Sequence, residues 1–167
     1  MERQGERFYN TAFFFGPDGP LGRYHKTHIG WWRLLHTPGD ELPVFDSPWG
    51  KLGVLICFDR QFPEAARALA LAGALLLAVP SNGMYGGIND HMMMTRAYEN
   101  AAYLAFAHPL DSLIISPGGR VIAANEEAGR EEVVVRRIDL TRARELRLHP
   151  ESLLSERQPH LYRSLSQ

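Results

Sequence analysis

Residues 51–58 read Lys-Leu-Gly-Val-Leu-Ile-Cys-Phe, a short and nearly continuous apolar run. Such a run predicts a β-strand that is covered on both faces, as the strands of parallel sheets are. The pair Pro-Glu at 63–64 favours the first turn of a helix over residues 63–72, which Gly73 ends. A second apolar run follows at 74–79. Strand, helix and strand in this order predict a right-handed unit with parallel strands.

Further elements of an α/β domain are predicted on both sides of this unit. Aromatic and β-favouring residues at 9–15 precede a Gly/Pro cluster at 16–20, which predicts a hairpin that returns to Tyr24. Asp90 is expected to be the N-cap of a helix that ends near Ala101. The other predicted elements are a strand at 103–107, a hairpin of 113–116 with 121–124, a strand at 132–138, a helix capped by Asp139, and a polar tail from residue 150.

Composition narrows the class of protein. The 167 residues include 18 Lys+Arg and 19 Asp+Glu, which gives a formal net charge of −1, and 45% of them are hydrophobic. This describes one ordinary domain, and the lack of a basic run argues against a nucleic-acid partner, which would require clustered positive charge. A single cysteine excludes an internal disulfide and a cysteine-rich zinc module. We therefore expect a protein of a reducing compartment, the cytoplasm.

No membrane segment is predicted either. The longest apolar run, 65–80, is interrupted by Arg67 and Gly73, and residues 1–6 are polar, unlike a secretory leader. We therefore expect neither a membrane span nor a signal peptide.

Cys57 and Lys26 are the candidate reactive residues. Cys57 ends the first predicted strand, directly before a helix N-terminus; ligands gather at that end of open α/β sheets, and a helix N-terminus favours the thiolate. This placement is typical of a nucleophile, although free cysteines are also often small buried hydrophobes. Lys26 ends another predicted strand, where an ammonium can stabilise an oxyanion; a solvated lysine is the alternative. His25 and His28 alternate faces on a strand, so we expect no metal site.

Several motifs follow one another along the chain in a specific order. They are Tyr-His-Lys-Thr-His at 24–28, Thr-Pro-Gly-Asp at 37–40, Gly-Val-Leu-Ile-Cys-Phe-Asp at 53–59, Phe-Pro-Glu-Ala-Ala-Arg at 62–67 and Arg-Ala-Tyr-Glu-Asn at 96–100. Their order and spacing closely resemble the carbon–nitrogen hydrolase (nitrilase/amidase) superfamily, roughly from residue 5 to residue 147. The resemblance implies an α/β fold, a four-layer αββα sandwich that is N-terminally truncated here, with residues 1–149 as a partial domain and 150–167 as a C-terminal tail.

The resemblance also implies a reaction, the hydrolysis of non-peptide carbon–nitrogen bonds by a Glu-Lys-Cys triad. Cys57 would attack an amide, carbamoyl or nitrile carbon and form a thioester or thioimidate. Lys26 and the backbone N–H of Phe58 would stabilise the oxyanion. The substrate would be a small molecule, with an amidase or N-carbamoyl amidohydrolase preferred to a nitrilase, and no cofactor or metal is needed. Relatives commonly assemble, so we expect a homo-oligomer.

This sequence departs from the family pattern at the triad glutamate. In the family that base lies well upstream of the lysine motif, and Glu2 and Glu6 resemble instead the residues that precede the strand at Tyr9. Residues 29–36, Ile-Gly-Trp-Trp-Arg-Leu-Leu-His, also lack the second glutamate that many relatives carry there. We therefore expect a fragment, from an incomplete gene or an internal Met start. The alternative function is a catalytically silent homologue that acts through self-association or a partner chain.

Three further residues are candidates for substrate binding. Arg60 matches an arginine with which carbamoylase relatives recognise a carboxylate, and a surface arginine is the alternative. Asn82 and Tyr85 follow the second predicted strand on the rim of Cys57 and can line the pocket, with loop contacts as the alternative.

Other polar residues have mainly structural interpretations. Asp59 is expected to hold the turn after Cys57 or cap the helix, and Arg96 to pair with Glu99 along one helix. A different mechanism, a Cys-His hydrolase, would use one of the three histidines His28, His91 and His108 as its base.

Overall fold

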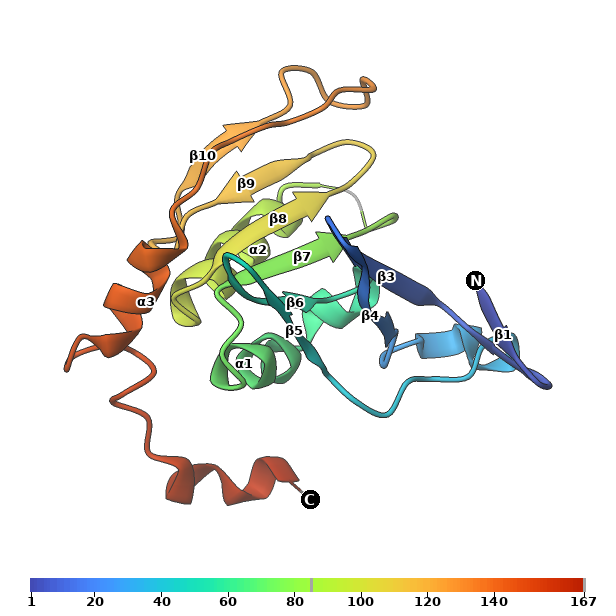
Figure 1. Ribbon diagram of the computed structural model, residues 1–167, viewed down its shortest axis with the longest axis horizontal. Coiled ribbons are helices and arrows are strands. Elements are labelled where there is room, and N and C mark those ends of the chain that lie inside the picture. Colours follow the sequence, from blue (N-terminus) through green and yellow to red (C-terminus); the bar gives the residue numbers. More distant parts are fainter. Residues whose placement is uncertain (85, 167) are drawn as a thin grey trace.

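The computed structural model describes residues 1–84 and 86–166. Its main sheet has six strands in the order β10-β9-β8-β7-β6-β5 (Figure 1). Strands β6, β7 and β8 are parallel neighbours, whereas β5, β9 and β10 pair antiparallel. The bounds are β5 Val44–Ser47, β6 Gly50–Val54, β7 Leu76–Pro80, β8 Tyr103–Ala107, β9 Leu113–Ile115 and β10 Val121–Ala124. The predicted pair of parallel strands and the predicted β9–β10 hairpin are confirmed.

Two helices, α1 (Pro63–Leu71) and α2 (Ile88–Glu99), pack against one face of this sheet (Figure 1). Leu69 of α1 and Met93 of α2 are completely buried, in one core cluster with side chains of the strands. Gly53 lets α1 approach closely, because a Cβ at this position would lie 3.1 Å from Leu69 Cδ1. No helix in the described parts of the chain is both long and apolar enough to cross a bilayer.

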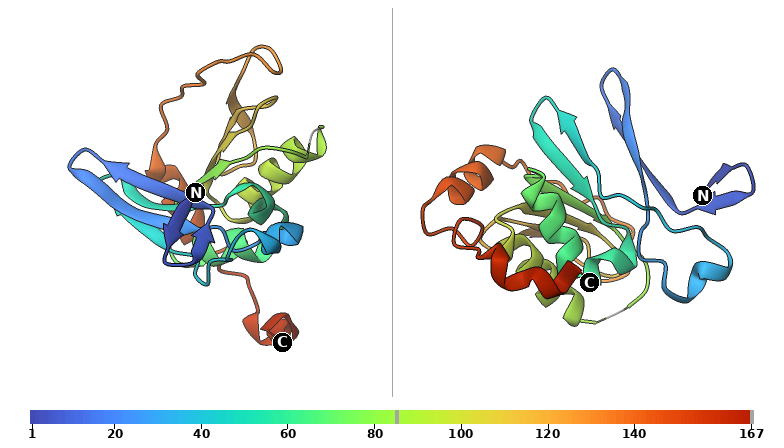
Figure 2. Two further views of the ribbon diagram at one scale, coloured as in Figure 1. Left: turned by 90° about the vertical axis from the view of Figure 1, so that its right-hand side faces the viewer. Right: turned by 90° about the horizontal axis from the view of Figure 1, so that it is seen from below.

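The opposite face is partly covered by a separate hairpin of β3 (Thr11–Gly16) and β4 (Gly19–His25), which the sequence predicted. The rings of Phe14 and Phe45 stack 4.9 Å apart, and Tyr24 packs with Val54 and Ile56. Figure 2 shows this hairpin and the β5–β6 hairpin projecting side by side. A short hairpin of β1 (Glu2–Gln4) and β2 (Arg7–Tyr9) precedes them. The hairpin β3–β4 thus forms a second layer of strands over the main sheet.

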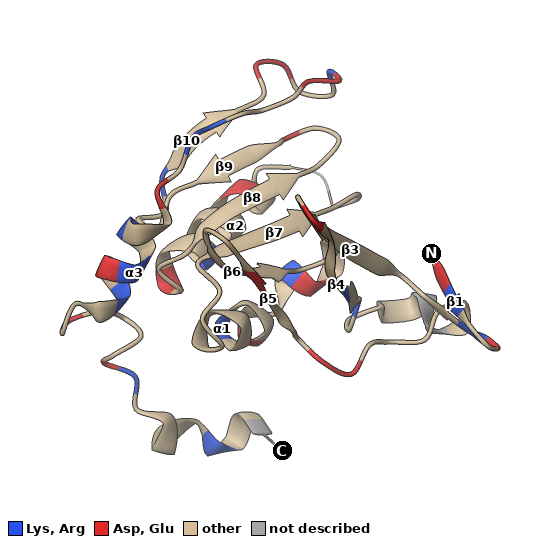
Figure 3. Ribbon diagram, in the orientation of Figure 1, with Lys and Arg blue, Asp and Glu red and all other residues tan. Residues whose placement is uncertain are grey.

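Helix α3 (Leu140–Leu148) contacts the C-terminal ends of α1 and α2. Asp139 caps it, as predicted, by accepting the N–H of Thr141 at 3.0 Å. The side chain of Arg147, one of several basic residues on this helix (Figure 3), donates to Ala101 O at 3.1 Å and Ala70 O at 3.2 Å. Burial lowers the pKa of Arg147 to about 10. Beyond α3 the chain ends in a 3₁₀ helix, η3 (Pro159–Ser166).

Three predicted boundaries or elements are wrong. Residues 132–138 form no strand, because they pair with no neighbouring backbone, and Val133 and Val135 are 85% and 79% exposed. Asp90 is not an N-cap; Gly87 is, and Asp90 lies in the first turn of α2. The strand expected to reach Cys57 ends at Val54, because the chain turns there into the 3₁₀ helix η2 (Cys57–Gln61).

Candidate active site

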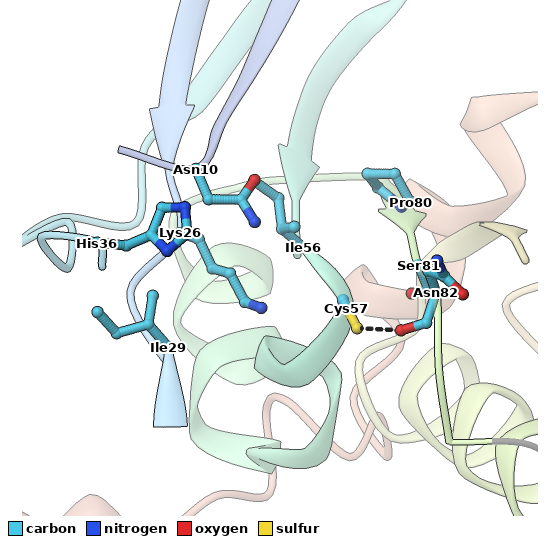
Figure 4. A pocket seen from close by; sticks show the side chains of 9 residues that line it. All are labelled: Asn10, Lys26, Ile29, His36, Ile56, Cys57, Pro80, Ser81 and Asn82. Carbon is cyan, nitrogen blue, oxygen red and sulfur yellow. Dashed lines mark hydrogen bonds between the residues drawn. The ribbon is translucent and has the colours of Figure 1, made fainter. Parts of the chain in front are cut away.

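Cys57 lies at a tight turn between β6 and η2. Its backbone has φ of 50°, a left-handed conformation that is strained for a residue with a Cβ. Its Sγ donates to the backbone oxygen of Asn82, which follows β7, at 2.8 Å (Figure 4). The free thiol is only partly buried. A strained turn of this kind presents the sulfur at the carboxyl end of the parallel strands, where ligands of α/β sheets bind.

Asp59 holds this turn in place. Its side chain is completely buried and accepts hydrogen bonds from the N–H of Ile56 at 2.8 Å, the hydroxyl of Tyr24 at 2.8 Å and the N–H of His28 at 2.9 Å. The hydroxyl of Thr27 at 3.2 Å and the ring Nδ1 of His28 at 2.9 Å also contact this carboxylate. Burial, and next the charge of Asp59, raise the pKa of Tyr24. Asp59 therefore joins the turn of Cys57 to the segment of Lys26, and its expected structural role is confirmed.

Lys26 directly follows β4 and is 8% exposed, so the alternative of a solvated lysine is wrong. Its backbone N–H donates to Asn10 O at 2.9 Å, and its carbonyl accepts the N–H of Gly39 at 2.9 Å. Gly39 has no room for a Cβ, which would lie 2.2 Å from the backbone oxygen of His25. Figure 4 shows the ammonium of Lys26 reaching into the pocket toward Cys57. Among the described residues it pairs with no carboxylate.

Two adjoining pockets of about 420 and 190 Å³ meet at these residues. Both are lined by Lys26, Ile29, Cys57 and Asn82. The larger one is also lined by Asn10, His36, Ile56, Pro80 and Ser81, and the smaller one by Gly30, Trp31, Phe58, Arg60, Gln61, Gly83 and Met84. The structure therefore brings together five of the six predicted site residues, Cys57, Lys26, Phe58, Arg60 and Asn82. Tyr85 lies outside the described residues.

Arg60 is completely buried, so the alternative of a surface arginine is wrong. Its guanidinium donates to Asn89 Oδ1 from Nε at 3.1 Å and from Nη2 at 2.9 Å. Nη2 also donates to Gly83 O at 3.1 Å, and Nη1 lies 3.4 Å from Cys57 Sγ.

The expected pair of Arg96 and Glu99 is present on α2, with an N···O distance of 3.1 Å.

Some residues of the site were missed from the sequence. Asn10 and His36 line the larger pocket, each immediately beside a recognised segment, the strand β3 and the Thr-Pro-Gly motif. Their proximity to those motifs was the available signal. The three histidines of the Cys-His hypothesis line neither pocket: His28 contacts Asp59, His91 lies on the surface of α2 near Gly87, and His108 contacts Gly83 O.

No Asp or Glu is among the described residues that line the two pockets. Glu2 is engaged elsewhere, with Arg23 at 2.6 Å and His25 at 3.0 Å. Hydrogen bonds, the strongest from Gln4, lower the pKa of Glu2 to about 2. The sequence-based conclusion that Glu2 does not replace the triad base agrees with this placement.

The described residues also hold no group of three or more His, Cys, Asp or Glu side chains suited to a shared metal ion.

Comparison with protein families identifies this architecture. The model of the carbon–nitrogen hydrolase family matches residues 1–148. The chain belongs to the carbon–nitrogen hydrolase family. A probable nitrilase of Schizosaccharomyces pombe is 36% identical over 178 residues, which cover 98% of this chain and 65% of that protein. A nitrilase of Pyrococcus abyssi is 38% identical, and the human omega-amidase 33%. Their alignments cover 89% and 87% of this chain, but only 60% and 61% of those proteins. The chain thus spans less than two thirds of the length of these curated relatives.

Solved structures confirm the nitrilase-like α/β fold. The crystal structure of a carbon–nitrogen hydrolase from Helicobacter pylori G27 superimposes with a TM-score of 0.87 at 26% identity, over 98% of this chain and 67% of that one. The NitFhit protein of Caenorhabditis elegans gives a TM-score of 0.80 at 29% identity, over 93% of this chain and 43% of that one. The strand layers and helices described above are therefore those of this carbon–nitrogen hydrolase fold.

Proposed function

We propose that this protein hydrolyses carbon–nitrogen bonds of small amides or N-carbamoyl compounds, with Cys57 as the nucleophile. One observation carries the proposal: the thiol at a strained turn shares a pocket with the buried ammonium of Lys26, which pairs with no carboxylate among the described residues. A nucleophile beside a fixed positive charge is the arrangement that acyl transfer needs.

The proposed reaction has two halves. Cys57 Sγ gives its proton to a base and bonds to the carbonyl carbon, and the C–N bond breaks as the leaving nitrogen takes up a proton. This leaves a thioester on Cys57 and releases ammonia or an amine. Water then adds to the thioester carbon, the C–S bond breaks, and the products are a carboxylic or carbamic acid and the regenerated thiol.

Lys26 and Phe58 are proposed to stabilise the tetrahedral intermediate. Lys26 is held by backbone bonds to Asn10 and Gly39, so its ammonium needs little reorganisation as the negative charge develops. Phe58 follows Cys57 in η2 and lines the smaller pocket. Its N–H is proposed as the second donor to the oxyanion.

The substrate class is supported by the relatives and by the size of the site. The curated relatives include a protein described as a nitrilase, others described as omega-amidases, and an (R)-stereoselective amidase of Pseudomonas at 34% identity. Pockets of about 420 and 190 Å³ suit a small molecule. We propose an amide substrate in preference to a nitrile, and self-association of the chain.

A second candidate function is a catalytically silent homologue that acts through a partner chain. The observation that favours it is the lack of any carboxylate among the described residues lining the pockets, because the first half of the reaction requires a proton acceptor. The two candidates make opposite predictions for turnover by this chain.

The test is ammonia release from a panel of primary amides and N-carbamoyl amino acids, together with intact-mass detection of the acylated protein. Wild type is expected to gain the mass of the acyl group on Cys57 and to release ammonia. Cys57→Ala is expected to abolish both, and Lys26→Met to lower the rate of acylation by at least about 100-fold. A folded wild-type protein that forms no adduct and releases no ammonia would establish the silent homologue instead.

A further inference from the structure

Arg60 is a buried cation that pairs with no carboxylate in the described part of the chain. Its side chain is 0% exposed, and its hydrogen bonds go to the neutral acceptors Asn89 Oδ1 and Gly83 O and to Cys57 Sγ. Its guanidinium carbon also lies 5.7 Å from the centre of the Phe106 ring. None of the ion pairs among the described residues includes Arg60. Burying a charge without a counter-ion is costly, so this arrangement calls for an explanation.

Arg96 provides the internal contrast. It is also buried, at 9% exposure, and it braces the same turn by donating to Arg60 O at 3.2 Å and Gln61 O at 3.3 Å. Unlike Arg60, it is paired with a carboxylate, that of Glu99. Both arginines therefore support the 3₁₀ turn of η2. Among the described residues Arg96 pairs with a carboxylate, whereas Arg60, which contacts the thiol, does not.

We propose that Arg60 is a positioning residue that holds Cys57 Sγ in place and serves as the counter-ion of its thiolate. The inference rests on Cys57 being the reactive thiol of the proposed function, and it does not require turnover. With its proton present, the thiol donates to Asn82 O at 2.8 Å. When the proton leaves, that bond is lost, and the sulfur accepts from Nη1 of Arg60, which already lies 3.4 Å away.

The geometry disfavours the other role for Arg60, that of an anchor for a substrate carboxylate. A guanidinium binds a carboxylate through two N–H groups on one edge. Here the Nε–Nη2 edge is occupied by Asn89 Oδ1, and the Nη1–Nη2 edge by Cys57 Sγ and Gly83 O. Neither edge presents two N–H groups to a ligand.

Other ionisable groups near Cys57 come from each element that packs around it. Lys26 reaches the pocket from the end of β4, and His36 from the loop before the Thr-Pro-Gly motif. Asp59 belongs to the same turn but directs its carboxylate to Tyr24 and His28, and His108, after β8, contacts Gly83 O. Among these groups Arg60 is the cation that contacts the sulfur, and Lys26 is a second cation that lines the same pocket.

The test is the rate of alkylation of Cys57 by iodoacetamide as a function of pH, on the full chain. Arg60→Gln removes the charge, and we expect it to move the midpoint of the pH–rate profile upward and to slow alkylation at pH 7 about tenfold. Arg60→Lys, which keeps the charge, is expected to retain most of the rate. Arg96→Gln is the matched control, because it weakens the same turn without touching the sulfur, and its profile should stay within about twofold of wild type.

Two results would overturn the proposal. One is an unchanged profile for Arg60→Gln with a native circular-dichroism spectrum. The other is an equal loss of rate in Arg96→Gln, which would assign the effect to the turn and not to the charge.

A second measurement covers the case in which Arg60→Gln does not fold. In Lys26→Met, the ratio of the iodoacetate rate to the iodoacetamide rate is compared with the same ratio for 2-mercaptoethanol. A higher ratio in the protein supports an uncompensated cation at the sulfur, and an equal or lower ratio contradicts it. Alkylation needs no hydrolysis, so a shifted profile without turnover contradicts only the proposed function, and turnover with an unshifted profile contradicts only the role of Arg60.

Discussion

The candidate active site has two walls, η2 on one side and the segment that follows β4 on the other, which differ in burial and in hydrogen bonding. The wall of η2 carries Cys57, and its neighbours Asp59 and Arg60 are completely buried and fully engaged in hydrogen bonds within the fold. The wall that follows β4 carries Lys26, but it continues into the 3₁₀ helix η1 (Gly30–Leu34), where Trp31 and Leu34 are 85% and 94% exposed.

Asp59 connects the two walls, because it accepts from Ile56 on one side and from Tyr24 and His28 on the other. The side that carries the candidate nucleophile, Cys57, is therefore preorganised by buried polar contacts. On the side that carries Lys26, the carboxylate of Asp59 holds Tyr24 and His28, whereas η1 beyond them carries exposed side chains.

The largest effect is expected from Asp59→Ala. The substitution removes the acceptor of the buried Ile56 N–H and Tyr24 hydroxyl and of the part-buried His28 N–H, and it breaks the link between the walls. We therefore expect the free energy of unfolding to fall by about 3–5 kcal/mol. Urea denaturation measures it. Asp46→Ala is the control: its carboxylate is 83% exposed and pairs with Lys51 at 3.0 Å, and its loss should cost less than about 1 kcal/mol. Similar costs for the two variants would show that Asp59 is not the anchor.

A smaller effect is expected from relieving the strain at Cys57. Because its φ is 50°, glycine adopts this conformation more readily than alanine does. We expect Cys57→Gly to be more stable than Cys57→Ala by about 1 kcal/mol, measured as the difference in thermal midpoint. Greater stability of the alanine variant would mean that the turn is not strained.

A pH-dependent effect is expected at the base of the lysine wall. The pKa of Glu2 is lowered to about 2 in the folded protein, so its contacts with His25 and Arg23 stabilise the fold above the ordinary glutamate pKa of 4.5. That contribution is lost as the pH falls toward 2. Glu2→Gln is expected to lower the thermal midpoint slightly at pH 7 and to flatten its decline below pH 4.5. An unchanged slope in acid would contradict this contribution.

The smallest effect is expected from Leu34→Gln, on the open part of the lysine wall. This side chain is 94% exposed, so the free energy of unfolding should change by less than about 0.5 kcal/mol. Equilibrium denaturation of the purified variant measures it. A loss of more than about 1 kcal/mol would show that an interface covers this residue in solution.

The sequence predicted correctly those elements whose burial and chain direction follow from a local pattern of residues. The apolar run that contains Cys57, the Pro-Glu pair that opens α1 and Gly73 predicted the parallel strands β6 and β7 and the helix between them. The prediction was wrong at 132–138, where three consecutive valines favour a strand but no backbone of the described residues pairs with them. Pairing is a long-range property that a local pattern does not contain.

The candidate site shows the same division. The motifs alone identified Cys57 and Lys26, because few residue types can attack a carbonyl carbon or stabilise an oxyanion. They did not reveal the burial of Arg60 or the entry of His36 into the pocket. Those features depend on segments that are distant in sequence and meet in the folded structure.

The class of fold, the parallel strands and the two candidate reactive side chains, Cys57 and Lys26, were thus predictable from the sequence. These depend on hydrophobic periodicity and on residue chemistry, which are written locally along the chain. The pair of Arg96 and Glu99 was also predictable, whereas the burial of Arg60 and its contact with the thiol of Cys57 became visible only in the folded structure. A pair three residues apart on one helix is a local feature, but the surroundings of Arg60 come from Gly83 and Asn89, which are distant in sequence and pack against it in space.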